Sequence, residues 1–252
     1  MLVSKDWLQK NLSNPNLVIL DTRPKTMYLY GHLPNSQNLT VEQIIKFDKF
    51  GSNLVPDSDY ASSIFGSLGI DNTKTVLIVG DSIDPSATRI AWTLLYFGHE
   101  KTFLLDSNIS ELKPQGFEFT KIPSKPIRRI FTPKVNTKIR IESKYLHENL
   151  SRFAILDART PQEYMMGHIP KSKLIPFTEG IGVNGKFFQE KDSLEKIFLD
   201  KKISKNSEIV CYCMHGHRAS SLFFQLLEAG FENVKLYDGS FVEWHGRGLP
   251  LE

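Results

Sequence analysis

The sequence predicts an α/β protein made of two tandem copies of one domain, each a mainly parallel sheet flanked by helices. The first observation is a repeat: LVILDTR at 17–23 returns as FAILDAR at 153–159, an offset of 136 residues. A Gly-His-x-Pro motif at 31–34 returns at 167–170 with the same offset. The second observation is that strand-like apolar runs alternate with helix-like segments in both halves, which is typical of parallel sheets covered by helices.

The elements of the two copies are expected in the same order. Each copy opens with a short strand that ends in Asp-x-Arg, followed by a short helix. A central strand, a longer helix and a last strand follow, and a glycine stands where each longer helix should end. In the first copy we expect helices at 24–30 and 86–97 and strands at 75–79 and 102–105. In the second copy we expect helices at 161–166 and 219–229 and strands at 208–212 and 234–237.

We expect the domains to span residues 1–120 and 137–252, joined by a linker at 121–136. The stretch from 121 to 140 holds three prolines and seven basic residues but no acidic one. Proline-rich segments form semi-stiff spacers. We interpret this stretch as a solvated linker; a clasp across the two domains, or a contact for an acidic partner, is the alternative.

Composition limits the class of protein. The chain has 252 residues, 40% of them hydrophobic, which is enough for two ordinary cores. A net charge of +3 does not favour a nucleic-acid partner. The two cysteines make no disulfide framework, and the chain shows neither an apolar signal core nor the run of about 18 apolar residues of a membrane helix. We therefore expect a cytoplasmic protein with no membrane or nucleic-acid partner.

The most informative segment is VCYCMHGHRAS at 210–220. A β-branched and aromatic run ends at Cys213, an arginine follows five residues later, and a helix-like run begins at once. This order of strand, short loop and helix N-terminus forms an anion cradle, because free backbone N–H groups point into the loop. A thiolate at Cys213 would be stabilised by those groups, by the helix dipole and by the nearby basic side chains.

The other cysteine has a different environment. Cys211 lies inside the apolar run, so we interpret it as a packing residue. The alternation of Cys211, Cys213, His215 and His217 also raises the possibility of a metal site. In an extended strand these side chains would span roughly 20 Å, whereas zinc needs its ligand atoms at about 2.0–2.3 Å. We expect no metal.

Three signatures follow one another in the second half of the chain. The first is Asp157-Ala-Arg159, then Glu163-Tyr164 and Gly-His-Ile-Pro at 167–170. The second is Cys213-x-x-Gly-x-Arg218-Ala. The third is LYDGS at 236–240, followed by Trp and Gly-Leu-Pro. In this order they resemble the rhodanese (sulfurtransferase) family and cover nearly all of residues 137–252, whereas residues 1–120 resemble the same fold more weakly and carry Asp81 at the cysteine position.

The resemblance implies an inactive first domain and a catalytic second one. Cys213 would take a sulfane sulfur from a donor, most simply thiosulfate, and pass it as a persulfide to cyanide or a thiol, without a cofactor. The donor and acceptor are then small molecules. The alternatives are 3-mercaptopyruvate as the donor, a non-catalytic rhodanese-like binding module, and a cysteine-based phosphatase. Phosphatases place five residues between cysteine and arginine, whereas this chain has four.

The expected active-site loop follows Cys213 and consists of Met214, His215, Gly216, His217 and Arg218. Met214 and His215 match neither the thiosulfate nor the mercaptopyruvate enzymes among the tandem relatives. We expect Asp157, Arg159 and Glu163 to support the loop, with Glu163 paired to Arg218. His215 is open to two interpretations, a donor-binding group or a solvent-facing residue, and for His217 we favour the second.

Two further histidines have a simpler interpretation. His32 and His168 occupy matching places in the two Gly-His-x-Pro motifs. Because the first copy lacks the nucleophile, we expect both to be structural.

Overall fold

The computed structural model describes all 252 residues. They form two compact units, each discontinuous in sequence. Unit 1 contains residues 1–44, 56–135 and 182–187, and unit 2 contains residues 45–55, 136–181 and 188–252. Each half of the sequence thus lends a short segment to the unit that the other half forms. The domain boundaries at 120 and 137 stay a prediction.

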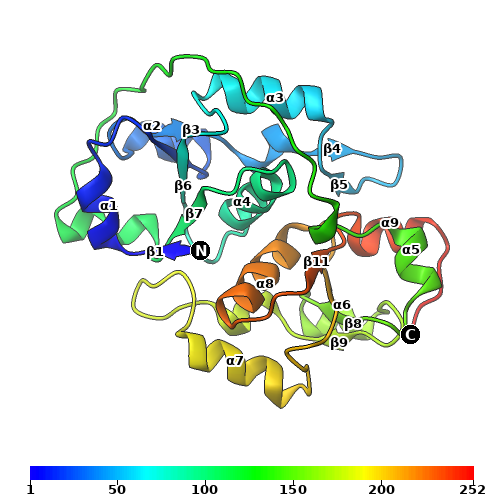
Figure 1. Cartoon of the computed structure of the whole chain (residues 1–252). Helices are drawn as coiled ribbons and strands as arrows, with labels where there is room; N and C mark the ends of the chain where they lie inside the picture. The colour runs from blue at the N-terminus through cyan, green and yellow to red at the C-terminus, as the bar shows by residue number, and fades with distance from the viewer. The chain divides into compact units, whose positions relative to one another are not determined.

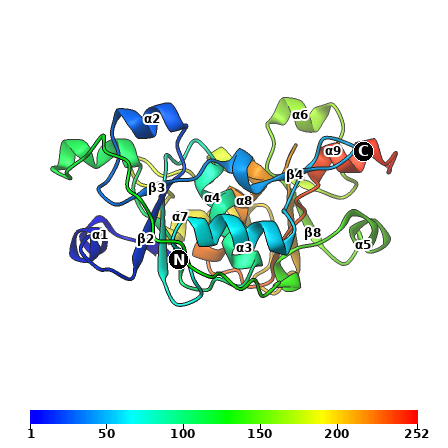
Figure 2. The ribbon, with the colours of Figure 1, turned by 90° about the horizontal axis from the view of Figure 1, so that it is seen from above.

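Unit 1 is built on a parallel five-stranded sheet in the order β1-β7-β6-β2-β3. The strands are β1 (Leu2–Val3), β2 (Leu17–Asp21), β3 (Gln37–Asn38), β6 (Thr75–Val79) and β7 (Thr102–Leu105). The helices are α1 (Lys5–Asn11), α2 (Lys25–Tyr30), α3 (Ser58–Ser67) and α4 (Ser86–Tyr96), with 3₁₀ turns η1 (Val41–Ile44), η2 (Ile109–Glu111) and η3 (Lys113–Gln115). Figures 1 and 2 both show α1 on one side of this sheet and α3 and α4 on the other.

Unit 2 is built on a parallel four-stranded sheet in the order β11-β10-β8-β9. Its strands are β8 (Ala154–Asp157), β9 (Lys173–Leu174), β10 (Ile209–Tyr212) and β11 (Val234–Leu236), and a separate antiparallel hairpin joins β4 (Lys46–Phe47) to β5 (Asn53–Leu54). The helices are α5 (Ser143–Glu148), α6 (Pro161–Met165), α7 (Lys191–Asp200), α8 (His217–Glu228) and α9 (Ser240–Gly246), with 3₁₀ turns η4 (Thr137–Ile139) and η5 (Phe177–Gly180). Figures 1 and 2 show α8 on one side of the sheet and α5 and α9 on the other.

The predicted α/β fold is confirmed, with parallel sheets in both units. The predicted strands and helices fall within a few residues of those observed. One difference matters for the site: α8 begins at His217, two residues earlier than expected, so that His217 and Arg218 belong to its first turn. Helices α1, α3, α5, α7 and α9, strand β1 and the β4–β5 hairpin were not predicted.

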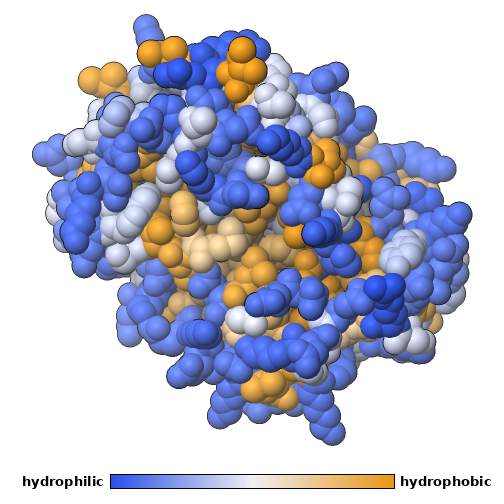
Figure 3. Space-filling model, viewed as in Figure 1, coloured by the Kyte–Doolittle hydropathy of each residue, from blue (hydrophilic) through white to orange (hydrophobic).

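The cores follow from the apolar strands. In unit 2, Val210 and Tyr212 of β10 pack with Trp244 of α9 and Leu146 of α5, all fully buried. In unit 1, Leu77 and Val79 of β6 lie in a buried cluster with Leu8 of α1. The face seen in Figure 3 is largely hydrophilic, with apolar patches between the polar side chains. None of the helices combines the length and the apolar character needed to cross a membrane.

The repeated Asp-x-Arg motif forms the same ion pair in both units. Arg159 donates to the Asp157 carboxylate at 2.7 Å and to the Gly167 carbonyl at 2.9 Å. Arg23 likewise donates to Asp21 at 2.6 Å and to the carbonyl of the matching glycine at 2.8 Å. In each unit the pair therefore links the end of one strand, β2 or β8, to the Gly-His-x-Pro turn that follows it.

The two histidines of these turns are structural, as expected. His32 stacks on Tyr28 and His168 on Tyr164, each with ring centroids 3.7 Å apart. Each histidine also shares a hydrogen bond with the backbone carbonyl of its tyrosine. The same arrangement occurs in the unit that has Cys213 and in the unit that has Asp81 at the matching position, which matches a role in the fold.

The Asp157–Arg159 pair yields a stability prediction. Both side chains are at most 1% exposed, so Asp157→Asn leaves a buried cation without its counter-charge and should lower the free energy of unfolding by about 3–5 kcal/mol. Arg152→Gln, which breaks an exposed pair with Glu208, should change it far less. Urea denaturation measures both variants. Equal losses would contradict the prediction.

Candidate active site

Cys213 lies where the central strand of unit 2 turns into a helix. β10 ends at Tyr212, residues 213–216 form the loop, and α8 starts at His217. Gly216 adopts a left-handed conformation with φ of 83°, which other residues rarely adopt. This turn brings the Gly216 N–H to the Cys213 Sγ atom at 3.1 Å. A backbone donor therefore already points at the sulfur.

The start of α9 holds the backbone of the Cys213 loop through two hydrogen bonds. The Phe241 N–H donates to the Cys213 carbonyl at 3.0 Å, and the Val242 N–H donates to the Met214 carbonyl at 3.2 Å. In a trans peptide the N–H points opposite to the C=O. The amides of Met214 and His215 are therefore turned away from α9, which is the arrangement of a backbone anion cradle.

Ser240 holds the backbone of Cys213 itself. Its Oγ atom accepts a hydrogen bond from the Cys213 N–H at 3.1 Å and donates to the Tyr237 carbonyl at 2.8 Å. Ser240 is fully buried and has a φ of 54°, an uncommon conformation for a residue other than glycine. Such strain persists only where the surrounding structure imposes it, and it is frequent at functional sites.

Arg218 and Glu163 form the ion pair expected from the sequence. Arg218 Nη1 and Nη2 each lie 2.7 Å from a different oxygen of Glu163. The hydrogen bond from Arg218 lowers the pKa of Glu163 to about 2, helped by the N–H of Thr160. Glu163 and Thr160 also form a capping box at the start of α6. The loop and α6 are thereby joined by a charged, bidentate contact.

The arginine also acts on the sulfur. The pKa of Arg218 is raised, first by its hydrogen bond to Glu163 and further by its electrostatic attraction to Cys213. The positive charge is therefore within reach of the thiol. The same charge is paired with the Glu163 carboxylate through two hydrogen bonds.

Asp157 and Arg159 support the loop indirectly. The Arg159 guanidinium lies over the Phe241 ring, 4.0 Å from its centroid, as a cation–π contact. Phe241 in turn donates its N–H to Cys213. The buried Asp157–Arg159 pair therefore contacts the residue whose N–H binds the Cys213 carbonyl.

The histidines of the loop have different surroundings. His215 is exposed, whereas His217 is partly buried. Asn53 of β5, itself buried, places its side-chain nitrogen 3.0 Å from Nε2 of His217. His217 is therefore only partly solvent-facing, because one ring nitrogen lies against Asn53. Sequence reasoning missed Asn53 because it lies 164 residues from its partner, in the first repeat.

The two cysteines are both free and buried, but they differ in chemistry. Burial, and to a smaller extent the neighbouring Cys213, raises the pKa of Cys211 well above its usual value. Cys211 therefore stays a neutral packing thiol at physiological pH. No group of three or more histidine, cysteine, aspartate or glutamate side chains is placed to hold a metal ion.

The matching position of unit 1 has no sulfur. Asp81 follows β6, and its Oδ1 atom accepts hydrogen bonds from the Ser110 N–H at 3.3 Å and hydroxyl at 2.9 Å. The carboxylate is thus tied to the neighbouring η2 turn. A negative group held there would repel an anionic donor.

The fold and this loop define a class: tandem α/β domains with one cysteine at a strand–loop–helix anion cradle. A family profile described as the rhodanese-like domain matches residues 4–114 and again residues 142–247. The chain belongs to the rhodanese family.

Known proteins resemble it over its whole length. It is 28% identical to the sulfur carrier protein TtuD of Thermus thermophilus, over 100% of this chain and 96% of that protein. It is 26% identical to the thiosulfate sulfurtransferase of Rattus norvegicus, over 99% of this chain and 93% of that protein. The crystal structure of SseA from Escherichia coli, described as a 3-mercaptopyruvate sulfotransferase, superposes with a TM-score of 0.86 at 23% identity, covering 95% of this chain and 98% of SseA. This last likeness shows the shared fold.

The Glu163–Arg218 pair predicts a pH dependence. Because the folded-state pKa of Glu163 is lowered from 4.5 to about 2, the pair's contribution to stability is complete above about pH 4.5 and is lost as the pH falls through about 2. An NMR titration of the Glu163 carboxyl carbon should show a midpoint near 2 in the wild type. In Arg218→Gln the midpoint should move toward the ordinary glutamate value. A wild-type midpoint equal to that of the variant would contradict the pairing in solution.

Proposed function

We propose that the chain is a sulfurtransferase in which Cys213 carries a sulfane sulfur, as a persulfide, from thiosulfate to a thiophilic acceptor such as cyanide or a thiol. The observation that carries this proposal is the cradle around Cys213, with the Gly216 N–H at 3.1 Å from Sγ and two further loop amides turned away from α9. Such a cradle suits a sulfur that bears negative charge before and after the transfer.

The proposed reaction has two displacement steps. The Cys213 thiolate attacks the outer sulfur of thiosulfate, the S–S bond of the donor breaks, and sulfite leaves with the electron pair. The enzyme then holds Cys213 as a persulfide whose terminal sulfur is anionic. The acceptor attacks that sulfur, the persulfide S–S bond breaks, and the Cys213 thiolate is restored. With cyanide the product is thiocyanate, and the kinetics are ping-pong.

The residues around the loop take separate roles in this scheme. The loop amides and the N-terminus of α8 stabilise the anionic sulfur in each state. Arg218, neutralised by Glu163, keeps the loop in shape. His215 is exposed, so its ring is accessible to an incoming donor. The Asp81 loop of unit 1 takes no part in the sulfur chemistry, because a carboxylate cannot accept a sulfane sulfur as a thiolate does.

The names of the relatives favour thiosulfate as the donor. The rat protein is named a thiosulfate sulfurtransferase, and the Thermus protein is named a sulfur carrier. The second donor to test is 3-mercaptopyruvate, because SseA, whose fold this chain shares, is described with that substrate. A higher kcat/KM with 3-mercaptopyruvate than with thiosulfate would overturn the choice of donor but leave the role of Cys213 intact.

Thiocyanate formation from thiosulfate and cyanide tests the role of Cys213. The wild type should turn over, and double-reciprocal plots at several cyanide concentrations should be parallel. Cys213→Ser should abolish the activity, because a hydroxyl cannot form the persulfide. Cys211→Ser, which removes the other buried thiol, should retain activity even where it lowers stability. Activity that survives in Cys213→Ser would overturn the proposal.

Ser240 is predicted to position the nucleophile. Ser240→Ala leaves the buried Cys213 N–H without its acceptor, at a cost of about 1–3 kcal/mol, and should lower kcat by roughly tenfold or more. Ser143→Ala is the matched control, because Ser143 is also a buried serine of unit 2, whose hydroxyl bonds Glu243 and makes no hydrogen bond to residues 213–216. It should lower the melting temperature with kcat unchanged. Equal kcat losses in the two variants would show that Ser240 acts only through stability.

A further inference from the structure

A pocket in unit 1 has no role in the proposed sulfur chemistry. It is a cavity of about 230 Å³ between the start of β2, the end of α3 and linker residues 124–129. Leu17 and Val18 open β2, and Lys74 directly precedes β6, so the pocket lies at the N-terminal edge of the sheet. Asp81 follows the opposite end of β6. We name this cavity the linker pocket.

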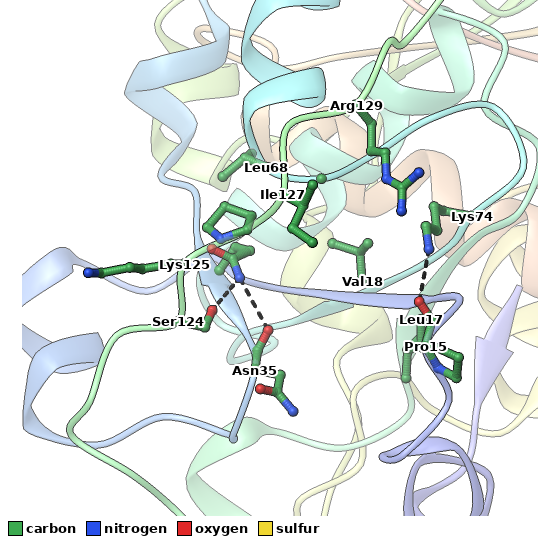
Figure 4. A pocket seen from close by; sticks show the side chains of 13 residues that line it. Pro15, Leu17, Val18, Asn35, Leu68, Lys74, Ser124, Lys125, Ile127 and Arg129 are labelled. Carbon is green, nitrogen blue, oxygen red and sulfur yellow. Dashed lines mark hydrogen bonds between the residues drawn. The ribbon is translucent and has the colours of Figure 1, made fainter.

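The charges of the linker pocket are one-sided. Three of its lining residues, Lys74, Lys125 and Arg129, are basic, and none is acidic. Figure 4 shows the Arg129 guanidinium and the Lys74 ammonium at the same end of the pocket, while Lys125 extends away on the other side. Two like charges on one wall raise each other's electrostatic energy, and an anion between them lowers it.

Neither cation forms an ion pair within the fold, although Lys74 attracts the Asp71 carboxylate electrostatically. The Arg129 guanidinium makes no hydrogen bond or ion pair. The Lys74 ammonium donates to two neutral oxygens, the Pro15 carbonyl at 2.8 Å and the Asn16 side chain at 3.4 Å. The carboxylate near Lys74 is Asp71, whose Oδ1 atom accepts from the Thr73 and Lys74 backbone and so caps its own turn.

The wall that carries Arg129 is fixed in place. Its N–H donates to the Gly66 carbonyl of α3 at 2.9 Å, and a Cβ atom added at Gly66 would lie 2.5 Å from the Arg129 carbonyl oxygen. Only glycine allows this approach. Two residues on, Phe131 is buried and its carbonyl accepts from Ser62 at 2.6 Å. The linker is therefore docked on α3 here, and the backbone position of Arg129 is set before any ligand binds.

The uncharged residues that line the pocket indicate the chemistry of the rest of the ligand. Val18, Leu68 and Ile127 supply apolar surface between the cationic end and a polar end. At the polar end the Gln37 amide donates to the Ser124 hydroxyl, which donates to the Ser36 carbonyl. The volume is below that of the usual pockets for drug-sized ligands. A short molecule with an oxyanion at one end fits this distribution.

We propose that the linker pocket binds a small phosphorylated molecule, with its phosphate between Arg129 and Lys74 and its short body over Val18, Leu68 and Ile127. A guanidinium can bind phosphate oxygens in a bidentate manner, and a lysine adds a point charge. The site uses no residue of the Cys213 loop, so the proposal stands independently of the sulfurtransferase function.

Calorimetric titration of the full chain with glycerol 3-phosphate, at physiological ionic strength, tests this site. The wild type should bind one molecule in a saturable manner, and Arg129→Gln and Lys74→Gln should each weaken binding by about tenfold. Arg128→Gln is the matched control: the neighbouring exposed arginine loses the same charge but does not line the pocket. It should change the affinity less than about twofold. Melting temperature and thiocyanate formation should be unchanged in all three variants.

Three results decide the matter. Inorganic phosphate, titrated in parallel, should bind at the same site and show the same sensitivity to Arg129→Gln, whatever its affinity. An equal loss in Arg128→Gln and Arg129→Gln would overturn the proposal, because binding would then reflect a general basic surface. The proposal would also be overturned if neither glycerol 3-phosphate nor inorganic phosphate bound saturably at millimolar concentrations.

Discussion

The site depends on the backbone hydrogen bonds between the start of α9 and the Cys213 loop. Two helix N–H groups bind the carbonyls of Cys213 and Met214, and the Ser240 hydroxyl binds the Cys213 N–H. These contacts set the direction of the first three peptide groups after the strand, from Tyr212 to His215. They leave N–H groups, and not carbonyls, free to face a negatively charged sulfur. Without them the same loop sequence would have no defined cradle.

The remaining contacts hold that arrangement from two further sides. The Arg218–Glu163 pair joins the first turn of α8 to α6, and the Arg159 guanidinium packs on Phe241 of α9. Both ion pairs consist of an arginine and a carboxylate, but they differ in exposure. The Asp157–Arg159 pair is fully buried and recurs in unit 1 as Asp21–Arg23, so it belongs to the common fold. The Arg218–Glu163 pair lies beside the Cys213 loop, whereas unit 1 has Asp81 at the position that matches Cys213.

The sequence allowed the fold and part of the site to be predicted. The strands of the repeat and the helices after them were visible because their apolar patterns are continuous, and the Glu163–Arg218 pair followed from two charges in the rhodanese signatures. Asn53 was not visible, because its contact with His217 joins residues 164 positions apart through a short hairpin with little periodicity. The role of Ser240 rests on a positive φ that no residue pattern signals. The linker looked like solvated chain because its charges are exposed, whereas its docking depends on the absence of a side chain at Gly66.

The central claim is that Cys213 forms a persulfide. The most direct measurement is the intact mass of the protein after incubation with thiosulfate, before and after the addition of cyanide. The account predicts a gain of one sulfur atom that cyanide removes, with no gain in Cys213→Ser. No gain with thiosulfate, together with none in a parallel incubation with 3-mercaptopyruvate, would contradict it. A gain that persists in Cys213→Ser would place the sulfur on another residue and contradict it as well.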